Sequence, residues 1–382
     1  MSAAGPPQGP PSQRGEAQAR RARPRARMAA DTQGHPLALS GEEAAANCSP
    51  SGGSAAATAA SVGAHRTRIA MVLLAFAVLA AFPRFAQPDY LTLVLPAFAY
   101  SIALWGFNLL FGYTGLLSFG HALFVASGAY GAAVLSSKLG VRSFELVLLI
   151  AGAAAVAVAI PVALLAVRYV RIFFGILTLA FGMLFHSFLF KFYDLTGGDT
   201  GIRVLRPSLL GMDFKELDKT AFLIGPFYYY CLALLIVLGV MMWRLVHSPF
   251  GLHLAAIREN PRKAEYLGVR VRFFRLIAFL ISAFYCAVGG VILAINIGQA
   301  DPELAYWTHS GELVFMTVLG GFANFFGPLV GAFAFIFLKS ELMGATQYWR
   351  FFLGVTLVLI VVLFPRGLMG VGMDLWSRVR RK

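Results

Sequence analysis

Long apolar runs separated by short polar segments constrain the fold of this chain more than any other feature of its sequence. Examples are Met71–Ala81, Phe144–Val167 and Phe351–Phe364. With their flanks these runs approach the roughly 20 residues that an α-helix needs to cross a bilayer. Only 13% of the residues are charged, whereas an ordinary soluble domain carries roughly 25%. This number of charges is too small for a water-exposed surface. Most of the chain is therefore expected to fold in lipid.

Ten membrane-spanning helices are expected after His65, because apolar stretches alternate there with polar breaks. The predicted spans cover residues 69–85, 91–111, 115–137, 144–167, 172–192, 221–245, 275–297, 307–321, 327–346 and 350–365. The eighth is short, and small residues interrupt the third. The predicted fold is therefore an all-α polytopic membrane protein of about ten transmembrane helices.

Lysine and arginine residues in the short loops predict the orientation, since such residues stay preferentially on the cytoplasmic side. Four basic groups fall on one side of a ten-span topology. They are Arg66 and Arg68; Arg168 and Arg171; Arg258, Arg262, Lys263, Arg270, Arg272 and Arg275; and Arg378, Arg380, Arg381 and Lys382. Both termini are then cytoplasmic, and the mixed-charge loop 193–220 is the largest external segment.

Residues 1–65 differ from the rest of the chain because they are rich in Ala, Gly, Pro, Ser and Arg. Such a segment cannot bury enough apolar surface to offset the entropy lost on ordering. We therefore expect a disordered cytoplasmic tail over 1–65, a transmembrane domain over 66–370 and a basic cytoplasmic tail over 371–382.

The formal net charge of +14 raises the question of nucleic-acid binding. The basic residues lie between apolar runs and form no stripe interleaved with exposed aromatic side chains, so the charge indicates topology and no nucleic-acid partner is expected. Cys48, Cys231 and Cys286 lie far apart, which predicts neither a disulfide framework nor a metal site.

The loop over residues 248–275 carries the most informative local pattern. Pro261 ends a first short helix, because the residue before a proline is disfavoured in the α region. It also suits the first turn of a second helix, with Asn260 as its cap and Gly268 at its end. A compact cytoplasmic knob of two helices is predicted. It either fixes the topology as a basic loop or acts as a coupling helix in a groove of a partner ATPase.

Four segments of the chain resemble the branched-chain amino acid ABC permease family, specifically its M-type subunit. The clearest are the run Ala256–Val269, which looks like the family's cytoplasmic loop, and Gly112–Ala122 and Leu319–Ala332, which look like its early membrane motif and its late glycine-rich turn. The weaker segment is Leu177–Gly182 followed by Thr196–Gly198. Together the similarities cover roughly residues 68–370.

The resemblance implies a permease subunit in the bacterial inner membrane that imports branched-chain amino acids or related small solutes. It implies three kinds of protein partner: a second homologous permease, two cytoplasmic ATP-binding subunits and a periplasmic solute-binding protein. The residues implied to couple to the ATPase are Arg258, Glu259, Asn260, Pro261, Ala264, Glu265, Leu267 and Gly268. The chain has no Walker A sequence, so ATP hydrolysis is assigned to the separate subunits, and neither an enzymatic activity nor a cofactor is expected.

Two glycine-containing segments are candidates for the substrate path. The residues concerned are Gly112, Gly115, Ser118, Gly120 and His121 in the first path segment, and Thr196, Gly197 and Gly198 in the second. An interrupted helix can turn free backbone groups toward a zwitterionic solute. The alternative is that the glycines only pack helices and that His121 hydrogen-bonds a neighbouring helix.

Two other functions compete with an ABC permease. A secondary transporter would place ionisable residues at membrane depth to carry a coupling ion, and only Lys339 and Glu341 suit that role. An intramembrane enzyme would need paired carboxylates, a Glu-x-x-His helix or a nucleophile with its base. The predicted spans contain none of these arrangements, so the enzyme is the less favoured alternative.

Overall fold

The computed structural model describes residues 76–84, 88–169, 172–212, 214, 217–364 and 366–372. The tail expected over 1–65, most of the tail expected over 371–382 and about half of the first predicted span lie outside these ranges. Residues 76–81 are helical, and a short 3-10 turn follows at Phe82–Arg84.

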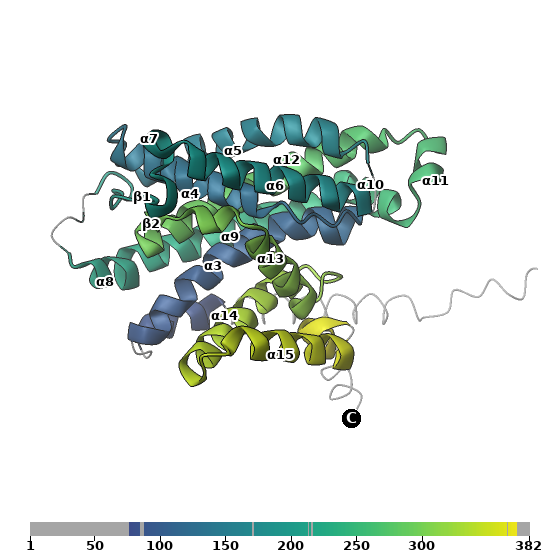
Figure 1. Cartoon of the computed structure of the whole chain (residues 1–382). Helices are drawn as coiled ribbons and strands as arrows, with labels where there is room; N and C mark the ends of the chain where they lie inside the picture. The colour runs from purple at the N-terminus through teal and green to yellow at the C-terminus, as the bar shows by residue number, and fades with distance from the viewer. Residues whose placement is uncertain are drawn as a thin grey trace, which may run out of the picture. The chain divides into compact units, whose positions relative to one another are not determined.

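The described residues form a helical membrane protein with two very short strands (Figure 1). The long helices are α3 (Pro88–Asn108), α4 (Ala122–Ser137), α5 (Phe144–Ala166), α6 (Ile172–Lys191), α9 (Tyr228–Val246), α12 (Val271–Ile297), α13 (Trp307–Gly320), α14 (Gly327–Ala345) and α15 (Trp349–Leu363). The short helices are α7 (Tyr193–Thr196), α8 (Lys219–Phe222), α10 (Pro249–Glu259) and α11 (Pro261–Tyr266). Two π-helices also occur, η2 (Leu109–Tyr113) directly after α3 and η4 (Leu223–Phe227) between α8 and α9. Strands β1 (Ile202–Arg203) and β2 (Gln299–Ala300) pair antiparallel, with Ile202 opposite Ala300.

Among the described residues, six helical segments are long and apolar enough to cross a membrane. They are Tyr90–Tyr113, Phe144–Ala166, Ile172–Lys191, Lys219–Val246, Val271–Ile297 and Gly327–Ala345. Helices α4 and α15 are apolar but shorter. Each predicted span from the second to the tenth overlaps a helix, so the polytopic all-α fold holds, while the count of ten remains a prediction.

The third predicted span begins too early. Residues 115–121 are not helical, and α4 starts only at Ala122. Gly115 has a φ of +73°, a conformation that side chains with a Cβ rarely adopt and that ends the helical path after η2. The sequence from Gly115 to His121 therefore forms a non-helical connection between η2 and α4.

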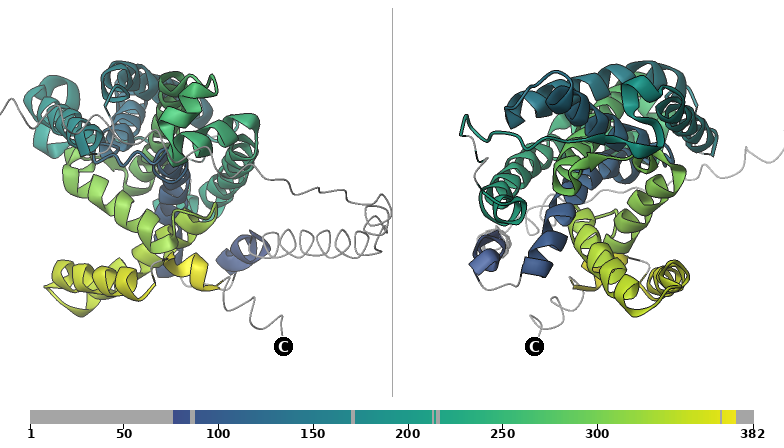
Figure 2. Two further views of the ribbon diagram at one scale, coloured as in Figure 1. Left: turned by 90° about the vertical axis from the view of Figure 1, so that its right-hand side faces the viewer. Right: turned by 60° about the vertical axis from the view of Figure 1, so that its left-hand side comes forward.

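Helix α12 is the centre of the fold and packs against α3, α4 and α5. Its side chains from Tyr285 to Ile295 are all buried. Helices α13, α14 and α15 form a second group, which joins the rest mainly through contacts of α14 with α3 (Figures 1 and 2). The knob of α10 and α11 lies at one end of the long helices, and α7, β1 and β2 lie at the other (Figure 1).

Glycines allow α4 and α12 to approach each other backbone to backbone. A Cβ placed on Gly128 would overlap the backbone of Ala287, and one on Gly290 would overlap the carbonyl group of Val125. Small residues are the usual means of close helix packing in membranes, where burial gains little over lipid.

This contact predicts the cost of adding one methyl group. Replacing Gly128 with Ala should destabilise the protein by about 1–3 kcal/mol, because the backbone of α12 must move away. The measurement is the thermal unfolding midpoint of the purified protein in detergent. Gly354→Ala on α15 is the matched control, since nothing lies within 4 Å of the Cβ added there. Equal midpoints for both variants would contradict the close packing.

Candidate functional site

The knob, residues 249–268, has the two helices that the sequence predicts. Asn260 is extended, and its side-chain oxygen accepts a hydrogen bond of 3.1 Å from the backbone N–H of Lys263. Pro261 occupies the first turn of α11, and Gly268 follows its end with a φ of +85°. Asn260 and Pro261 thus set the angle between α10 and α11.

A small apolar cluster holds the knob together. Ala264 is buried with Ile257 of α10 and Val271 at the start of α12. Ala264 therefore faces inward and stabilises the knob from inside. Glu259 and Glu265 are exposed.

The tip of the knob exposes large apolar and aromatic side chains. Tyr266 is 89% exposed and the adjacent Leu267 is 84% exposed, and neither belongs to the apolar clusters of the described residues. Sequence reasoning included Leu267 but missed Tyr266. The signal that could have identified Tyr266 is an aromatic residue directly before Leu267 and Gly268, in a loop otherwise rich in charge. A surface of this kind is typical of a protein contact, where Tyr is enriched.

Arg258 links the knob to the first path segment. Its guanidinium donates a hydrogen bond to the carbonyl oxygen of Gly112 and lies 5.5 Å from the centre of the Phe322 ring. Gly115 is also adjacent, because a Cβ there would lie 3.2 Å from Cγ of Arg258. The structure therefore brings together two sets of residues that the sequence assigned to separate roles.

His121, at the end of the first path segment, is completely buried. Its Nδ1 lies 2.7 Å from the hydroxyl oxygen of Ser118, and its Nε2 lies 2.9 Å from the hydroxyl oxygen of Ser282 on α12. Both ring nitrogens are occupied by protein partners, and the ring edges meet Phe107, Phe124 and Phe279. This arrangement favours the packing interpretation of His121 over a solute contact.

Gly120 also packs a helix. A Cβ at this position would overlap the carbonyl group of Thr178, so the segment before α4 lies directly against the backbone of α6. The role of Gly120 within this chain is thus close approach.

The second path segment begins at Thr196, the last residue of α7, and lies at the opposite end of the bundle (Figure 1). The hydroxyl of Thr196 donates to the carbonyl oxygens of Leu189 and Phe192, at 2.5 and 2.8 Å. Gly197 and Gly198 continue this turn toward β1. The structure does not bring the two predicted path segments together.

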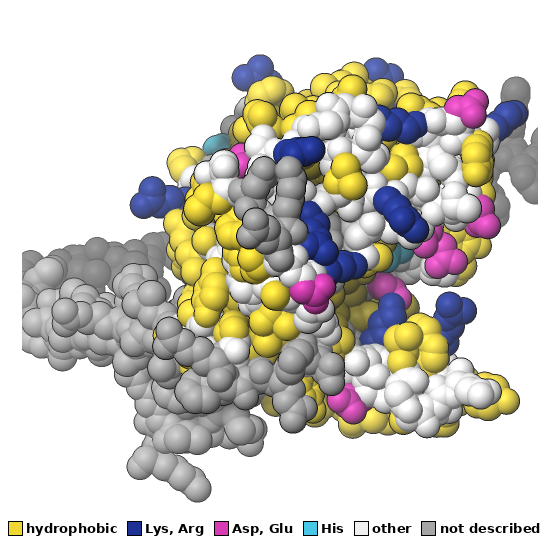
Figure 3. Space-filling model, turned by 90° about the vertical axis from the view of Figure 1, so that its left-hand side faces the viewer, with side chains coloured by type: hydrophobic (Ala, Val, Ile, Leu, Met, Phe, Trp, Pro, Cys, Tyr) yellow, Lys and Arg dark blue, Asp and Glu magenta, His cyan; other side chains and the backbone are white. Residues whose placement is uncertain are grey.

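The end of the molecule that carries α7 and β1 presents both basic and acidic side chains (Figure 3). This is the mixed-charge surface expected of loop 193–220. Lys219 donates a 3.0 Å hydrogen bond to the carbonyl oxygen of Ile297, and Arg206 donates a 2.6 Å hydrogen bond to that of Leu217. These basic side chains thus also satisfy backbone carbonyls in the loops at this end.

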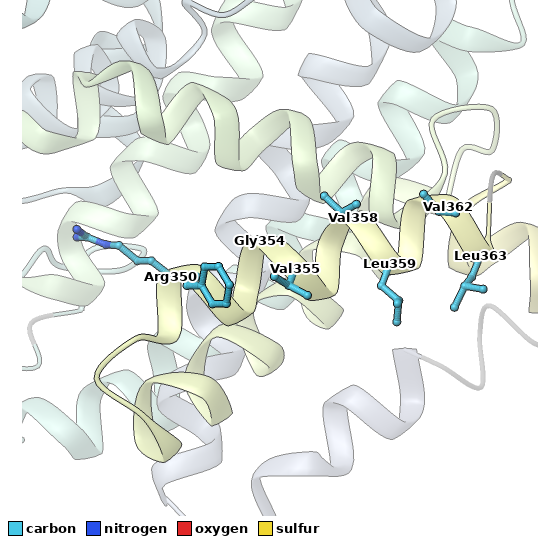
Figure 4. Close-up of a pocket in the computed structure, with 8 residues that line it drawn as sticks. Arg350, Gly354, Val355, Val358, Leu359, Val362 and Leu363 are labelled. Carbon is cyan, nitrogen blue, oxygen red and sulfur yellow. The ribbon is translucent and has the colours of Figure 1, made fainter.

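A pocket of about 630 Å³ follows one face of α15 (Figure 4). Its lining is apolar except for Arg350 at one end and comprises Arg350, Phe351, Gly354, Val355, Val358, Leu359, Val362 and Leu363. Such a groove lacks the polar groups that a zwitterionic solute requires and suits a lipid chain or another apolar helix. Within the described ranges, no group of three His, Cys, Asp or Glu side chains could hold a metal ion.

Comparison with known sequences decides the family. The profile of the family described as "branched-chain amino acid transport system / permease component" matches residues 90–361, which is more than half of the chain. This chain belongs to that permease family. The match covers α3 from residue 90 onward, α4 to α14, most of α15, the knob and both path segments.

Several curated proteins are similar to this permease over shorter or longer ranges. The high-affinity branched-chain amino acid transport system permease protein LivM of Escherichia coli K12 is 29% identical over 317 residues, covering 78% of this chain and 74% of LivM. The autoinducer 2 import system permease protein LsrC of Klebsiella pneumoniae is 30% identical over 165 residues, covering 40% and 46%. The galactose/methyl galactoside import permease protein MglC of Haemophilus influenzae is 24% identical over 213 residues, covering 52% and 60%. No solved structure matches the chain.

Lys339 of this permease forms an ion pair inside the group of α13, α14 and α15. Its Nζ lies 2.7 Å from a carboxylate oxygen of Glu312 and 5.5 Å from the centre of the Trp349 ring. His309 lies 3.6 Å from the other carboxylate oxygen. The sequence singled out Lys339 but did not identify Glu312 as its partner. Glu341, the other residue singled out, is exposed.

The ion pair predicts an asymmetric response to neutralising substitutions. Lys339→Met should cost about 2–3 kcal/mol, because the carboxylate of Glu312 loses the ammonium group that lies 2.7 Å from it and keeps only His309 nearby. The double variant Glu312→Gln, Lys339→Met should be more stable than this single variant. Thermal unfolding in detergent measures both, and Glu341→Gln on the same helix is the control. Independent, additive effects of the two substitutions would show that the pair contributes little.

Proposed function

We propose that this permease is a membrane subunit of an ABC importer for branched-chain amino acids or related small solutes. It forms the translocation path in the bacterial inner membrane with a second homologous permease. Two cytoplasmic ATP-binding subunits supply the energy, and a periplasmic solute-binding protein delivers the solute. The family description and the similarity to LivM support the branched-chain class, while LsrC and MglC carry names that refer to other solutes.

The observation that carries this proposal is the exposed tip of the knob. Exposure of Tyr266 and Leu267 to water is unfavourable. Burying two such side chains stabilises a complex by about 3–6 kcal/mol. The charged residues around them favour a protein groove over the hydrocarbon of a bilayer. The tip therefore has the chemistry of a docking site for an ATP-binding subunit.

We propose ten spans, with both termini and the knob in the cytoplasm and loop 193–220 outside. The position of the knob and of the mixed-charge loop at opposite ends of the long helices supports this orientation (Figure 1). The basic residues in the knob and at the C-terminus give the direction.

The docking proposal predicts that Tyr266→Ala with Leu267→Ala releases the ATP-binding subunits. Affinity for them should fall by roughly 100-fold or more, since about 3 kcal/mol or more of buried apolar contact is lost. The measurements are co-purification of the ATP-binding subunits and leucine uptake in proteoliposomes that contain the whole complex. Membrane abundance should not change, because both side chains are almost fully exposed.

The matched control for this pair lies at the other end of the molecule. Leu139 and Tyr193 are 66% and 62% exposed, so Leu139→Ala with Tyr193→Ala removes the same two side-chain types. That variant should retain its ATP-binding subunits. Normal co-purification and uptake by the knob variant would refute docking at the tip.

The orientation is tested by single cysteines at Arg206 and Arg262 in a background without the native cysteines. A membrane-impermeant maleimide added to intact cells with a permeable outer membrane should label position 206 and not position 262. Inside-out vesicles should give the reverse pattern. Labelling of both positions from one side would refute the ten-span topology.

A further inference from the structure

We propose that Arg258 is a positioning residue that transmits movement of the knob to the membrane helices. It does so by joining the end of η2 and the turn between α13 and α14. This inference rests on the proposed docking of ATP-binding subunits at the knob. It adds the route by which that docking would act on the spans.

The first contact is made possible by the end of η2. The last carbonyl groups of a helix have no partner within it, and a cation near this end also interacts favourably with the helix dipole. Gly112 lies in the last turn of η2, and its carbonyl oxygen accepts a hydrogen bond from the guanidinium of Arg258. The side chain of Arg258 thus satisfies a backbone group that would otherwise lack a protein partner.

The second contact reaches the turn between α13 and α14. The guanidinium lies 5.5 Å from the centre of the Phe322 ring, within the range of a cation–π interaction. The same ring lies 5.1 Å from that of Phe111 in η2. Residues 111, 258 and 322, which are far apart in the sequence, therefore meet at one point.

Glycines allow the close contacts at this junction. A Cβ on Gly112 would lie 2.7 Å from the carbonyl oxygen of Phe322, so η2 and the α13–α14 turn are in direct contact. A Cβ on Gly115 would lie 3.2 Å from Cγ of Arg258. The early glycine motif and the late glycine-rich turn are thus two sides of a single site around Arg258.

The chemistry of arginine suits this position better than that of lysine. A guanidinium can donate within its plane to the Gly112 carbonyl while its face stays available to an aromatic ring, whereas an ammonium has no such plane. Within the described residues, the ion pairs involve other side chains, so a carboxylate partner does not account for the placement of Arg258. Its two contacts instead indicate that Arg258 connects the knob to the membrane helices.

The test uses the whole complex in proteoliposomes, with leucine and the solute-binding protein supplied. Arg258→Ala and Arg258→Lys should retain their ATP-binding subunits, because Tyr266 and Leu267 are unchanged. Leucine transported per ATP hydrolysed should fall by about 3- to 30-fold, the range expected for residues that carry coupling between sites. Arg262→Ala is the control, since it removes the same charge from the same loop without touching η2.

An equal loss in Arg262→Ala would show that loop charge alone matters and would overturn the proposal. Unchanged coupling in both Arg258 variants would also overturn it, while leaving docking at the tip intact if the Tyr266, Leu267 variant still loses the ATP-binding subunits. If the Arg258 variants do not accumulate, Phe322→Leu decides, because it removes only the aromatic face. That variant should also transport less leucine per ATP, and normal coupling would refute the junction.

Discussion

The backbone contact between α4 and α12 is the constraint on which the rest of the structure depends. Gly128 and Gly290 bring the two helices so close that side chains at the start of α4 can contact α12. His121 then bridges Ser118 and Ser282. These bonds fix the connection between η2 and α4, and with it the position of Gly112 under Arg258. A wider separation of α4 and α12 would leave the buried imidazole without its partner, at a cost of about 1–3 kcal/mol.

Non-helical backbone inside a membrane protein must find its hydrogen bonds within the protein, because lipid supplies none. The connection from Gly115 to His121 and the residues that flank it, Gly112 and Ala122, do this in several ways. The N–H of Leu116 donates to the carbonyl oxygen of Leu110 at 3.2 Å, and the N–H of Ala122 donates to the hydroxyl of Ser310 at 3.0 Å. The contact of Arg258 with Gly112 belongs to the same set. The residues predicted to line a path are thus largely used to hold an interrupted helix in place.

Local features of the sequence predicted much of this structure, and contacts between distant segments were beyond it. The apolar runs predicted where helices α5, α6, α12 and α14 lie, and the Asn260–Pro261 pair predicted the two helices of the knob, because these depend on nearby residues only. The partner of His121 is Ser282, 161 positions away, and that of Arg258 is Gly112, 146 positions away. Nothing in the spacing of the chain identifies such pairs. The same is true of Glu312 and Lys339, whose pairing requires the α13–α14 hairpin to be folded.

Helix α13 has only 14 residues and is therefore about 21 Å long, whereas the hydrocarbon layer of a bilayer is about 30 Å thick. As the eighth span of the proposed topology, a helix this short cannot cover the hydrocarbon layer alone, so neighbouring protein must complete the crossing. Helix α13 packs against α14, α3 and α15, which are in place to shield its ends from lipid.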